Sequence, residues 1–264
     1  MASNQDHVIN LYGDGAYEDQ RAEHSRADNM EFHYTKKHIE PYIHADSIVA
    51  EIGCATGYYA MHFSDKCRQY HGVDIVPGNI AVFQEKIRER KLENVRAEIG
   101  DATDLRGLGD QRFDVVLALG PMYHLPKEER ERVIRESKRI CKAGGIIVFA
   151  YINKAGAYVK ACLEYKEIYP NQKTNEYVLR KGVDDQRPDV FYFTMPEEMA
   201  KTAALSGLTV LRNIGVDFTF DAEYINGMPE DQYAAWMELS ELMCGSESCT
   251  GLSNHALLIC RKPV

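Results

Sequence analysis

The chain has 264 residues, of which 45% are hydrophobic and 27% charged, a balance typical of a globular protein that folds in water. Its formal net charge is −9, which argues against nucleic-acid binding over a broad surface, because such surfaces depend on lysine and arginine to neutralise phosphates. No apolar run approaches the roughly 20 residues of a membrane span, so we expect neither a nucleic-acid partner nor a membrane anchor.

The ends and the cysteines suggest where the protein works. Residues 1–6 lack the charged and apolar regions of a signal peptide, so we expect a cytoplasmic location. The seven cysteines are scattered, none forms a CxxC pair, and no histidine stands near them at zinc-finger spacing. We therefore expect reduced thiols and no metal site.

The first half of the chain alternates short strands with amphipathic helices from Ser47 onward. The expected elements, in chain order, are a helix at 29–39, a strand at 47–50, a helix at 58–63, a strand at 70–73, a helix from Pro77, strands at 95–99 and 113–119, a helix from Pro126 that stops at Gly144-Gly145, and a strand at 146–151. The strand at 113–119 is an almost unbroken apolar run, typical of a strand covered on both faces. Such β-α alternation predicts a doubly wound, mostly parallel sheet with helices on both faces.

The second half changes character after the fifth strand. Residues 153–193 read as an insertion that contains a helix at 157–168 and a hairpin formed by 176–180 and 190–193. A helix at 196–206, a strand at 208–216, a helix at 229–243 and a strong strand at 256–260 follow. We expect residues 1–46 to form a helical lid segment and residues 47–264 a single domain.

The segment 51–57, Glu-Ile-Gly-Cys-Ala-Thr-Gly, lies between a predicted strand and a predicted helix, and Asp74 ends the next strand. Glycines at such a turn let the backbone approach a ligand closely, and an acid after the second strand can accept hydrogen bonds from both ribose hydroxyls. The pattern predicts a site for a nucleotide-like ligand. The spacing Gly53-x-x-x-Gly57 departs from Gly-x-Gly-x-x-Gly, which disfavours a dinucleotide-binding dehydrogenase.

Four segments together resemble class I, Rossmann-like S-adenosylmethionine-dependent methyltransferases of the bacterial small-molecule type. They are Glu51-x-Gly53-x-Ala55-x-Gly57, Asp74, Gly100-Asp101 and the strand at 113–119, and they cover roughly residues 45–152. The resemblance implies a seven-stranded sheet whose last strand, at 256–260, is antiparallel beside the fifth. The family usually carries glycine where Ala55 stands, and the turn should survive if φ at Ala55 is negative.

The resemblance also implies a set of residues that bind S-adenosylmethionine and its product S-adenosylhomocysteine. These residues are Glu51, Gly53, Cys54, Ala55, Gly57, Asp74, Ile75, Asn79, Asp101, Ala102, Leu119 and Gly120. The glycine-rich turn would line the amino-acid portion of the cofactor, with Glu51 below it. Asp74 would hold the ribose, and Asp101 the adenine amino group with Ala102 beside it. Ile75 would pack on the adenine, while Leu119 and Gly120 would form the floor that faces the methyl group.

The expected reaction is in-line displacement, in which the protein mainly positions the reactants and excludes water. A general base helps only where the nucleophile must lose a proton. His124, after the fourth strand, is the first candidate for this base, although it could instead pack or cap the following helix. Tyr123 is a candidate for orienting the acceptor, and Tyr151 is a weaker one. His255 reads as structural.

The surroundings of the site leave several alternatives open. Tyr12, Phe32 and Tyr34 could cover the cofactor as a lid, or the N-terminal helix could simply pack on the sheet. The five tyrosines of the insertion could shape an aromatic acceptor pocket or form a homodimer surface. These tyrosines are Tyr158, Tyr165, Tyr169, Tyr177 and Tyr192.

We expect a small-molecule acceptor, since the acidic chain carries no basic stripe. The alternatives are methylation of RNA or protein, and a non-catalytic protein that binds S-adenosylmethionine. An enzyme that methylates base amino groups would show an Asn/Asp-Pro-Pro-Tyr-like segment after the fourth strand, and residues 120–123 share only one proline and the tyrosine with it.

Overall fold

The computed structural model describes residues 4–13, 19–21 and 24–264. Residues 1–3, on which part of the signal-peptide expectation rests, lie outside the described residues. So do residues 14–18 and 22–23 of the predicted lid segment.

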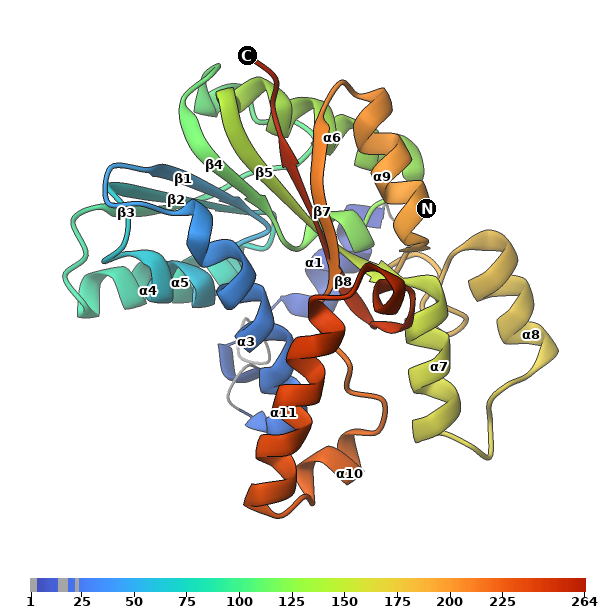
Figure 1. Ribbon diagram of the computed structural model, residues 1–264. Coiled ribbons are helices and arrows are strands. Elements are labelled where there is room, and N and C mark those ends of the chain that lie inside the picture. Colours follow the sequence, from blue (N-terminus) through green and yellow to red (C-terminus); the bar gives the residue numbers. More distant parts are fainter. Residues whose placement is uncertain (1–3, 14–18, 22–23) are drawn as a thin grey trace.

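One mixed sheet organises the molecule (Figure 1). Its strands are β1 (Ile48–Ile52), β2 (Gln69–Asp74), β3 (Val95–Ile99), β4 (Phe113–Ala118), β5 (Cys141–Asn153), β6 (Phe193–Thr194), β7 (Thr209–Gly215) and β8 (His255–Arg261). The order along the sheet is β3-β2-β1-β4-β5-β8-β7, and the two-residue β6 pairs with β5. The first five strands are parallel, and β8 is antiparallel to both β5 and β7. The predicted doubly wound sheet with an antiparallel last strand beside the fifth is confirmed.

Helices cover both faces of this sheet (Figure 1). They are α1 (Asn4–Tyr12), α3 (Arg26–Ile39), α4 (Tyr58–Phe63), α5 (Pro77–Glu89), α6 (Lys127–Ile140), α7 (Lys154–Glu164), α8 (Gln172–Thr174), α9 (Pro196–Leu205), α10 (Ala222–Asn226) and α11 (Glu230–Cys244). Helices α6 and α9 pack in one apolar core, whereas α3, α4, α5 and α11 contribute to the core on the opposite face. This arrangement leaves the ends of the parallel strands as the place where a ligand can enter.

Strand β4 shows why the sheet is buried on both sides. Val115 and Leu117 belong to the core under α3, α4 and α5, while Val116 and Ala118 belong to the core under α6 and α9. Alternate side chains of a strand point to opposite faces. The continuous apolar run in the sequence therefore reflects two cores, as predicted.

The boundary between α6 and β5 differs from the expectation. The helix ends at Ile140, and β5 begins at Cys141, so Gly144 and Gly145 lie inside the strand and do not stop the helix. The pairing with β4 shifts register between Phe113 and Val115. A bulge of this kind accommodates the extra residues, and a glycine in a strand often marks one.

The insertion contains helix α7 as predicted, but the predicted hairpin is wrong. Residues Asn175–Lys181 form a π-helix that continues from α8. The Asn171 side chain caps the start of α8, and Gly182, with φ of 71°, ends the π-helix. Local capping and the burial of Val178 thus outweigh the strand-like alternation of this segment.

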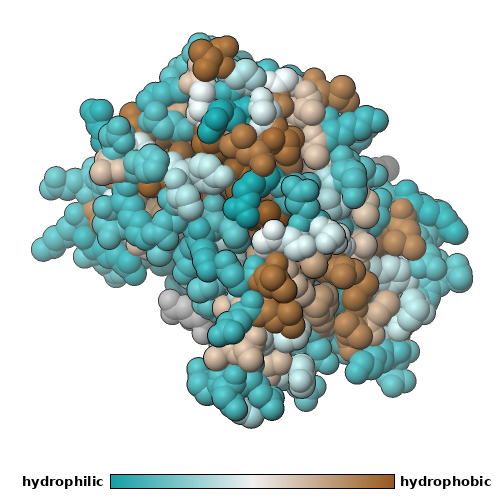
Figure 2. Space-filling view, viewed as in Figure 1, coloured by the Kyte–Doolittle hydropathy of each residue, from teal (hydrophilic) through white to brown (hydrophobic). Residues whose placement is uncertain are grey.

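The surface in Figure 2 is largely hydrophilic, with apolar side chains gathered toward the middle of the view, including the region between α7 and α11. Exposed apolar residues on these helices include Val159 and Leu163 on α7, and Leu239 and Leu242 on α11. Within the described ranges, no helix has both the length and the hydropathy to cross a bilayer.

Candidate functional site

A cavity of about 680 Å³ lies at the carboxyl ends of β1, β2 and β4. The chain runs from β1 to β2 on one side and places β4 on the other, and ligands bind at such a switch point in open α/β sheets. Ten of the predicted site residues line the cavity: Gly53, Ala55, Asp74, Ile75, Asn79, Asp101, Ala102, Gly120, Tyr123 and His124. Residues from distant parts of the sequence therefore meet as the pattern predicted.

Four predicted residues support the cavity without lining it. Cys54 and Leu119 are buried in the apolar core, and a Cβ added to Gly57 would lie 2.3–2.6 Å from the Phe83 ring. Glu51 is buried in β1, where the Tyr70 hydroxyl donates to its Oε2 at 2.8 Å. Burial raises the pKa of Glu51 to about 8, so this side chain is mainly a neutral acid at pH 7.

The glycine-rich turn adopts left-handed backbone angles. The φ angles are 75° at Gly53, 45° at Ala55 and 82° at Gly57. The turn survives with alanine at its centre, but φ there is positive, which corrects the expected condition. A Cβ on Gly53 would lie 2.7 Å from Pro121 Cδ and 3.0 Å from Gly120 Cα. Glycine at position 53 thus lets the loops after β1 and β4 approach each other beside the cavity.

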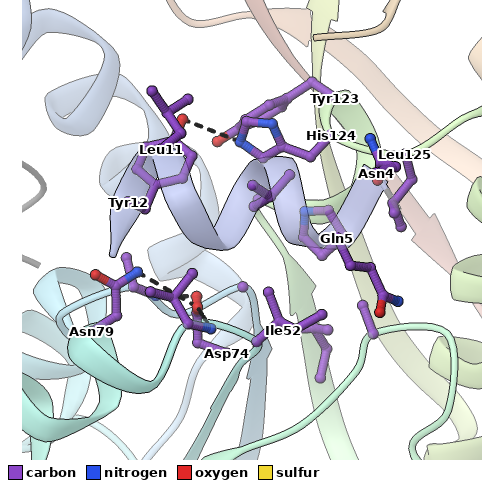
Figure 3. A pocket seen from close by; sticks show the side chains of 18 of the residues that line it. Asn4, Gln5, Leu11, Tyr12, Ile52, Asp74, Asn79, Tyr123, His124 and Leu125 are labelled. Atoms are coloured by element: carbon purple, nitrogen blue, oxygen red, sulfur yellow. Dashed lines mark hydrogen bonds between the residues drawn. The ribbon is translucent and has the colours of Figure 1, made fainter. Parts of the chain in front are cut away.

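Asp74 presents a buried carboxylate at the end of β2. Its Oδ2 accepts a hydrogen bond from the Ala55 amide at 2.8 Å, and its Oδ1 accepts one from the Val76 amide at 2.9 Å. Burial raises the pKa of Asp74, and these amides oppose the rise. The Asn79 amide nitrogen lies 3.5 Å from Asp74 Oδ1, as Figure 3 shows. Asn79 Oδ1 is buried and has no hydrogen-bond donor among the described residues. An unused hydrogen-bond acceptor therefore lies next to the Asp74 carboxylate.

Asp101 is tied to its own turn and to the N-terminal helix. Thr103 donates to its Oδ1 through the backbone amide at 2.8 Å and the hydroxyl at 2.9 Å. Gln5 Nε2 donates to Asp101 Oδ2 at 2.7 Å. An amide NH₂ group therefore already donates to the carboxylate that is expected to accept from the adenine amino group.

Helix α1 lies across the cavity, as Figure 3 shows. Asn4 donates to the Asp189 carbonyl at 2.6 Å, and the Tyr12 hydroxyl lies 3.3 Å from His124 Nε2. Tyr12 thus lines the cavity. Phe32 and Tyr34 do not line the cavity, because both side chains are buried in the apolar core that α3 shares with α4, α5 and α11.

His124 follows the short 3₁₀ helix Pro121–Tyr123. Its Nδ1 lies 3.0 Å from the Val190 carbonyl oxygen, which can only accept, so Nδ1 carries the ring proton. Nε2 then accepts from the Tyr12 hydroxyl. Burial lowers the pKa of His124 to about 4, so the ring is neutral near pH 7.

Several residues at this end of the cavity were not predicted from the sequence. Gln5, Val8 and Leu11 of α1, Arg187 and Phe191 of the insertion, and His255 line the cavity. The apolar spacing of Val8, Leu11 and Tyr12 is a helical signal that could have indicated α1. The other residues follow from tertiary packing alone.

The remaining aromatic candidates lie elsewhere. Tyr151 is fully buried, and its hydroxyl donates to Asn213 Oδ1 at 2.7 Å. None of the five tyrosines of the insertion lines the cavity. The aromatic side chains of this end are Tyr12, Tyr123 and Phe191.

Comparison with known proteins finds a family model that is similar to the central segment. Residues 49–145 match the family model described as methyltransferase domain. The phosphatidylethanolamine N-methyltransferase of Cereibacter sphaeroides is 34% identical over 101 residues, which cover 38% of this chain and 48% of that protein. The chain covers less than half the length of the curated relatives that it matches.

Solved structures share the fold over the whole chain. The [4+2]-cyclase SpnF has a TM-score of 0.65 at 18% identity, covering 100% of this chain and 98% of that one. The N-methyltransferase NodS from Bradyrhizobium japonicum WM9, in complex with S-adenosylhomocysteine, has a TM-score of 0.61 at 14% identity, covering 99% of this chain and 100% of that one.

Proposed function

We propose that the protein transfers a methyl group from S-adenosylmethionine to a small-molecule acceptor, because residues 49–145 match the family model described as methyltransferase domain. The observation that carries this proposal is the cavity at the switch point, with a buried carboxylate at one end and two histidines at the other. S-adenosylmethionine would supply a methyl group on a positively charged sulfur. The protein has to bind and orient the cofactor and the methyl acceptor, and it has to keep water out of the cavity.

The residues around Asp74 fit the cofactor. A carboxylate accepts about four hydrogen bonds. The Ala55, Val76 and Ile75 amides donate to Asp74, and the Asn79 amide nitrogen lies at the long distance of 3.5 Å, a contact that a ribose hydroxyl could replace. The unpartnered acceptor on Asn79 adds a second place for a hydroxyl donor. The volume of the cavity, about 680 Å³, lies in the usual range of roughly 300–1,000 Å³ for ligand sites.

The position of α1 supports a small acceptor. The first turn of the helix is tied to Asp189 through Asn4 and to Asp101 through Gln5, and its last residue, Tyr12, lies within hydrogen-bond distance of His124. A folded protein or a nucleic acid would have to displace this helix to reach the cavity. Together with the net charge of −9, this favours a small molecule and disfavours RNA.

We assign acceptor contacts to Tyr123 and His124. Both line the cavity after β4, on the side away from Asp74. His124 Nε2 accepts a hydrogen bond from Tyr12. A hydroxyl or amine of the molecule that is to be methylated could donate this hydrogen bond in place of Tyr12. A role as general base stays a prediction, and the low pKa of His124 makes it a weak base.

The fold alone does not decide the reaction, because one protein that shares it is a cyclase. A protein that binds S-adenosylmethionine without transferring its methyl group is therefore the second candidate.

Calorimetric titration with S-adenosylmethionine and S-adenosylhomocysteine tests the cofactor site. Asp74→Asn should weaken binding by about 1–3 kcal/mol, because charge-assisted hydrogen bonds to the ribose are lost. Asp65→Asn, at an exposed acid that does not line the cavity, is the control. Equal affinity of Asp74→Asn and the wild type would refute the ribose role.

A screen of small hydroxyl, amine and thiol compounds for release of S-adenosylhomocysteine then tests transfer. Release that depends on both the compound and the protein supports the proposal. Tight cofactor binding without release from any compound would favour the second candidate.

A further inference from the structure

His255 is a second histidine at the acceptor end of the cavity. It is the first residue of β8 and pairs with Ile152 of β5, which places it at the edge where the parallel strands end. Its ring centre lies 6.0 Å from that of Tyr123. The ring therefore borders the same space as Tyr123 and His124.

Asp217 fixes the orientation of this ring. His255 Nδ1 lies 3.0 Å from Asp217 Oδ2. A carboxylate can only accept, so Nδ1 carries the proton of the neutral ring and Nε2 keeps its lone pair. The Asn254 amide nitrogen lies 3.2 Å from Nδ1, but it donates to the same Asp217 oxygen at 3.0 Å. Across the described ranges nothing hydrogen-bonds to His255 Nε2, so this atom is available to a molecule in the cavity.

Asp217 is charged although it is only 5% exposed. Burial raises its pKa, but Lys160, His255 and Asn254 together outweigh this and hold the pKa of Asp217 below its usual range. A buried charge of this kind is stable only when it is paired and hydrogen-bonded. It stabilises an imidazolium beside it, because the two opposite charges are close and shielded from water.

Among the charged groups near His255, carboxylates outnumber basic side chains. Glu31 of α3 places Oε2 3.6 Å from His255 Nδ1 and also pairs with Arg21 at 3.3 Å. Lys160 of α7 pairs with Glu164 at 3.8 Å. Two carboxylates, Asp217 and Glu31, thus lie within 4 Å of His255 Nδ1. These two carboxylates provide the counter-charge for a proton that the ring accepts from a bound molecule.

His124 has a different environment. Its Nδ1 faces a backbone carbonyl, its Nε2 is engaged by Tyr12, and no carboxylate pairs with it in the described residues. A proton placed on this ring would lack a counter-charge. Of the two histidines, only His255 has a partner that compensates the charge a base acquires.

We propose that His255, oriented by Asp217, accepts the proton that the acceptor loses when it is methylated. This inference rests on the proposed function. His255 is then a catalytic residue and Asp217 a positioning residue. The acceptor belongs to the class whose nucleophilic atom has both a lone pair and a proton that must leave on methylation, a hydroxyl or a neutral amine with an N–H bond.

The step balances without a further reactant. The lone pair of the acceptor atom forms the bond to the methyl carbon, and the electrons of the carbon–sulfur bond remain on sulfur. The acceptor's proton moves to His255 Nε2, and the resulting imidazolium is paired with Asp217. Loss of this proton to solvent after product release restores the neutral ring.

Nuclear magnetic resonance of the ¹⁵N-histidine-labelled protein, bound to S-adenosylhomocysteine, tests the pair without turnover. In the wild type, His255 should be protonated at Nδ1 when neutral. Asp217→Asn should increase the population of the Nε2-protonated tautomer, whereas Asp65→Asn should leave the tautomer populations unchanged. A wild-type ring protonated at Nε2, or the same tautomer populations in Asp217→Asn as in the wild type, would overturn the proposal.

Turnover with an active phenol or amine from the screen tests the base role. His255→Gln should lower kcat at least about 100-fold, the scale of general base catalysis, with KM and S-adenosylhomocysteine affinity unchanged. The acidic limb of the kcat profile should disappear in His255→Gln and shift to lower pH in Asp217→Asn, with the limb partly restored in Asp217→Glu. His44→Gln, at an exposed histidine that does not line the cavity, is the matched control.

The outcomes separate this inference from the proposed function. Wild-type kcat in His255→Gln would overturn the base role and leave methyl transfer intact. A wild-type protein that binds S-adenosylhomocysteine but transfers no methyl group would overturn the proposed function and the proton transfer with it. If His255→Gln does not fold, the pH profile of Asp217→Asn decides, because a purely structural aspartate would not move the acidic limb.

Discussion

Glu51→Gln should change how the stability of the protein depends on pH. The wild-type carboxyl group is 1% exposed and accepts from Tyr70, and burial raises its pKa from 4.5 to about 8. In the unfolded chain the group loses its proton above pH 4.5, whereas in the folded protein it keeps the proton up to about pH 8. The folded state therefore binds more protons in this window, and its stability falls as pH rises.

The magnitude follows from proton linkage. Each pH unit inside the window costs roughly 1.4 kcal/mol of unfolding free energy, which gives about 2–3 kcal/mol between pH 5 and pH 7. Glutamine keeps the shape and an acceptor oxygen for Tyr70 but has no proton to lose. The contributions of all other titrating groups cancel when the unfolding free energy of the wild type is subtracted from that of the variant.

Urea unfolding of both proteins at pH 5, 6 and 7 measures this difference. The unfolding free energy of Glu51→Gln, relative to that of the wild type, should increase by about 2–3 kcal/mol from pH 5 to pH 7. Glu89→Gln, at an exposed acid of α5, should show no such change. A constant difference between Glu51→Gln and the wild type over this range would show that the carboxyl group is already ionised in the fold, and would refute the reasoning.

Three further substitutions test the turn and the acceptor end. Ala55→Gly should raise the unfolding free energy by roughly 0.5–1 kcal/mol in urea titration, because relief of left-handed strain exceeds the entropy cost of glycine; a loss of stability would contradict the observed φ of 45°. Gly57→Ala should cost about 2–4 kcal/mol, because its φ is 82° and its Cβ would overlap Phe83; thermal melting at the wild-type temperature would count against this packing. His124→Ala should leave calorimetric cofactor affinity intact and reduce turnover about tenfold through one lost hydrogen bond, and unchanged turnover would remove His124 from the acceptor site.

The sequence predicted the sheet and the cofactor end of the cavity because both depend on local signals. Apolar runs, a glycine turn and acids at strand ends are short-range patterns, and parallel strands bring their carboxyl ends to one edge. Asp74 and Asp101 could therefore be placed beside Gly53 from the sequence alone. The sign of φ at Ala55 could not, because a left-handed alanine is held by the surrounding packing and not by its own preference.

Apart from Tyr12, Tyr123 and His124, the residues of the proposed acceptor end were not predicted, for a physical reason. They lie on α1, in the insertion and at the start of β8, and no local pattern states that these segments meet. The π-helix within Asn175–Lys181 also runs against its strand-like alternation, because capping by Asn171 and Gly182 dominates. Tertiary packing decides where such residues go, and periodicity does not report it.

The division between the two ends has a consequence for specificity. The segment that matches the methyltransferase model, 49–145, carries every predicted cofactor residue, whereas α1, Arg187, Phe191 and His255 lie outside it. Chemistry common to the fold requires only that the cofactor be held at the strand ends, so the embellishments are free to differ with the acceptor. Because Gln5 contacts Asp101 and Tyr12 contacts His124 from a single helix, the proposed cofactor and acceptor sites would share a boundary. A change of acceptor should therefore be sought in α1, the insertion and the turn before β8, since substitutions there alter one end of the cavity while Asp74 and its amides stay in place.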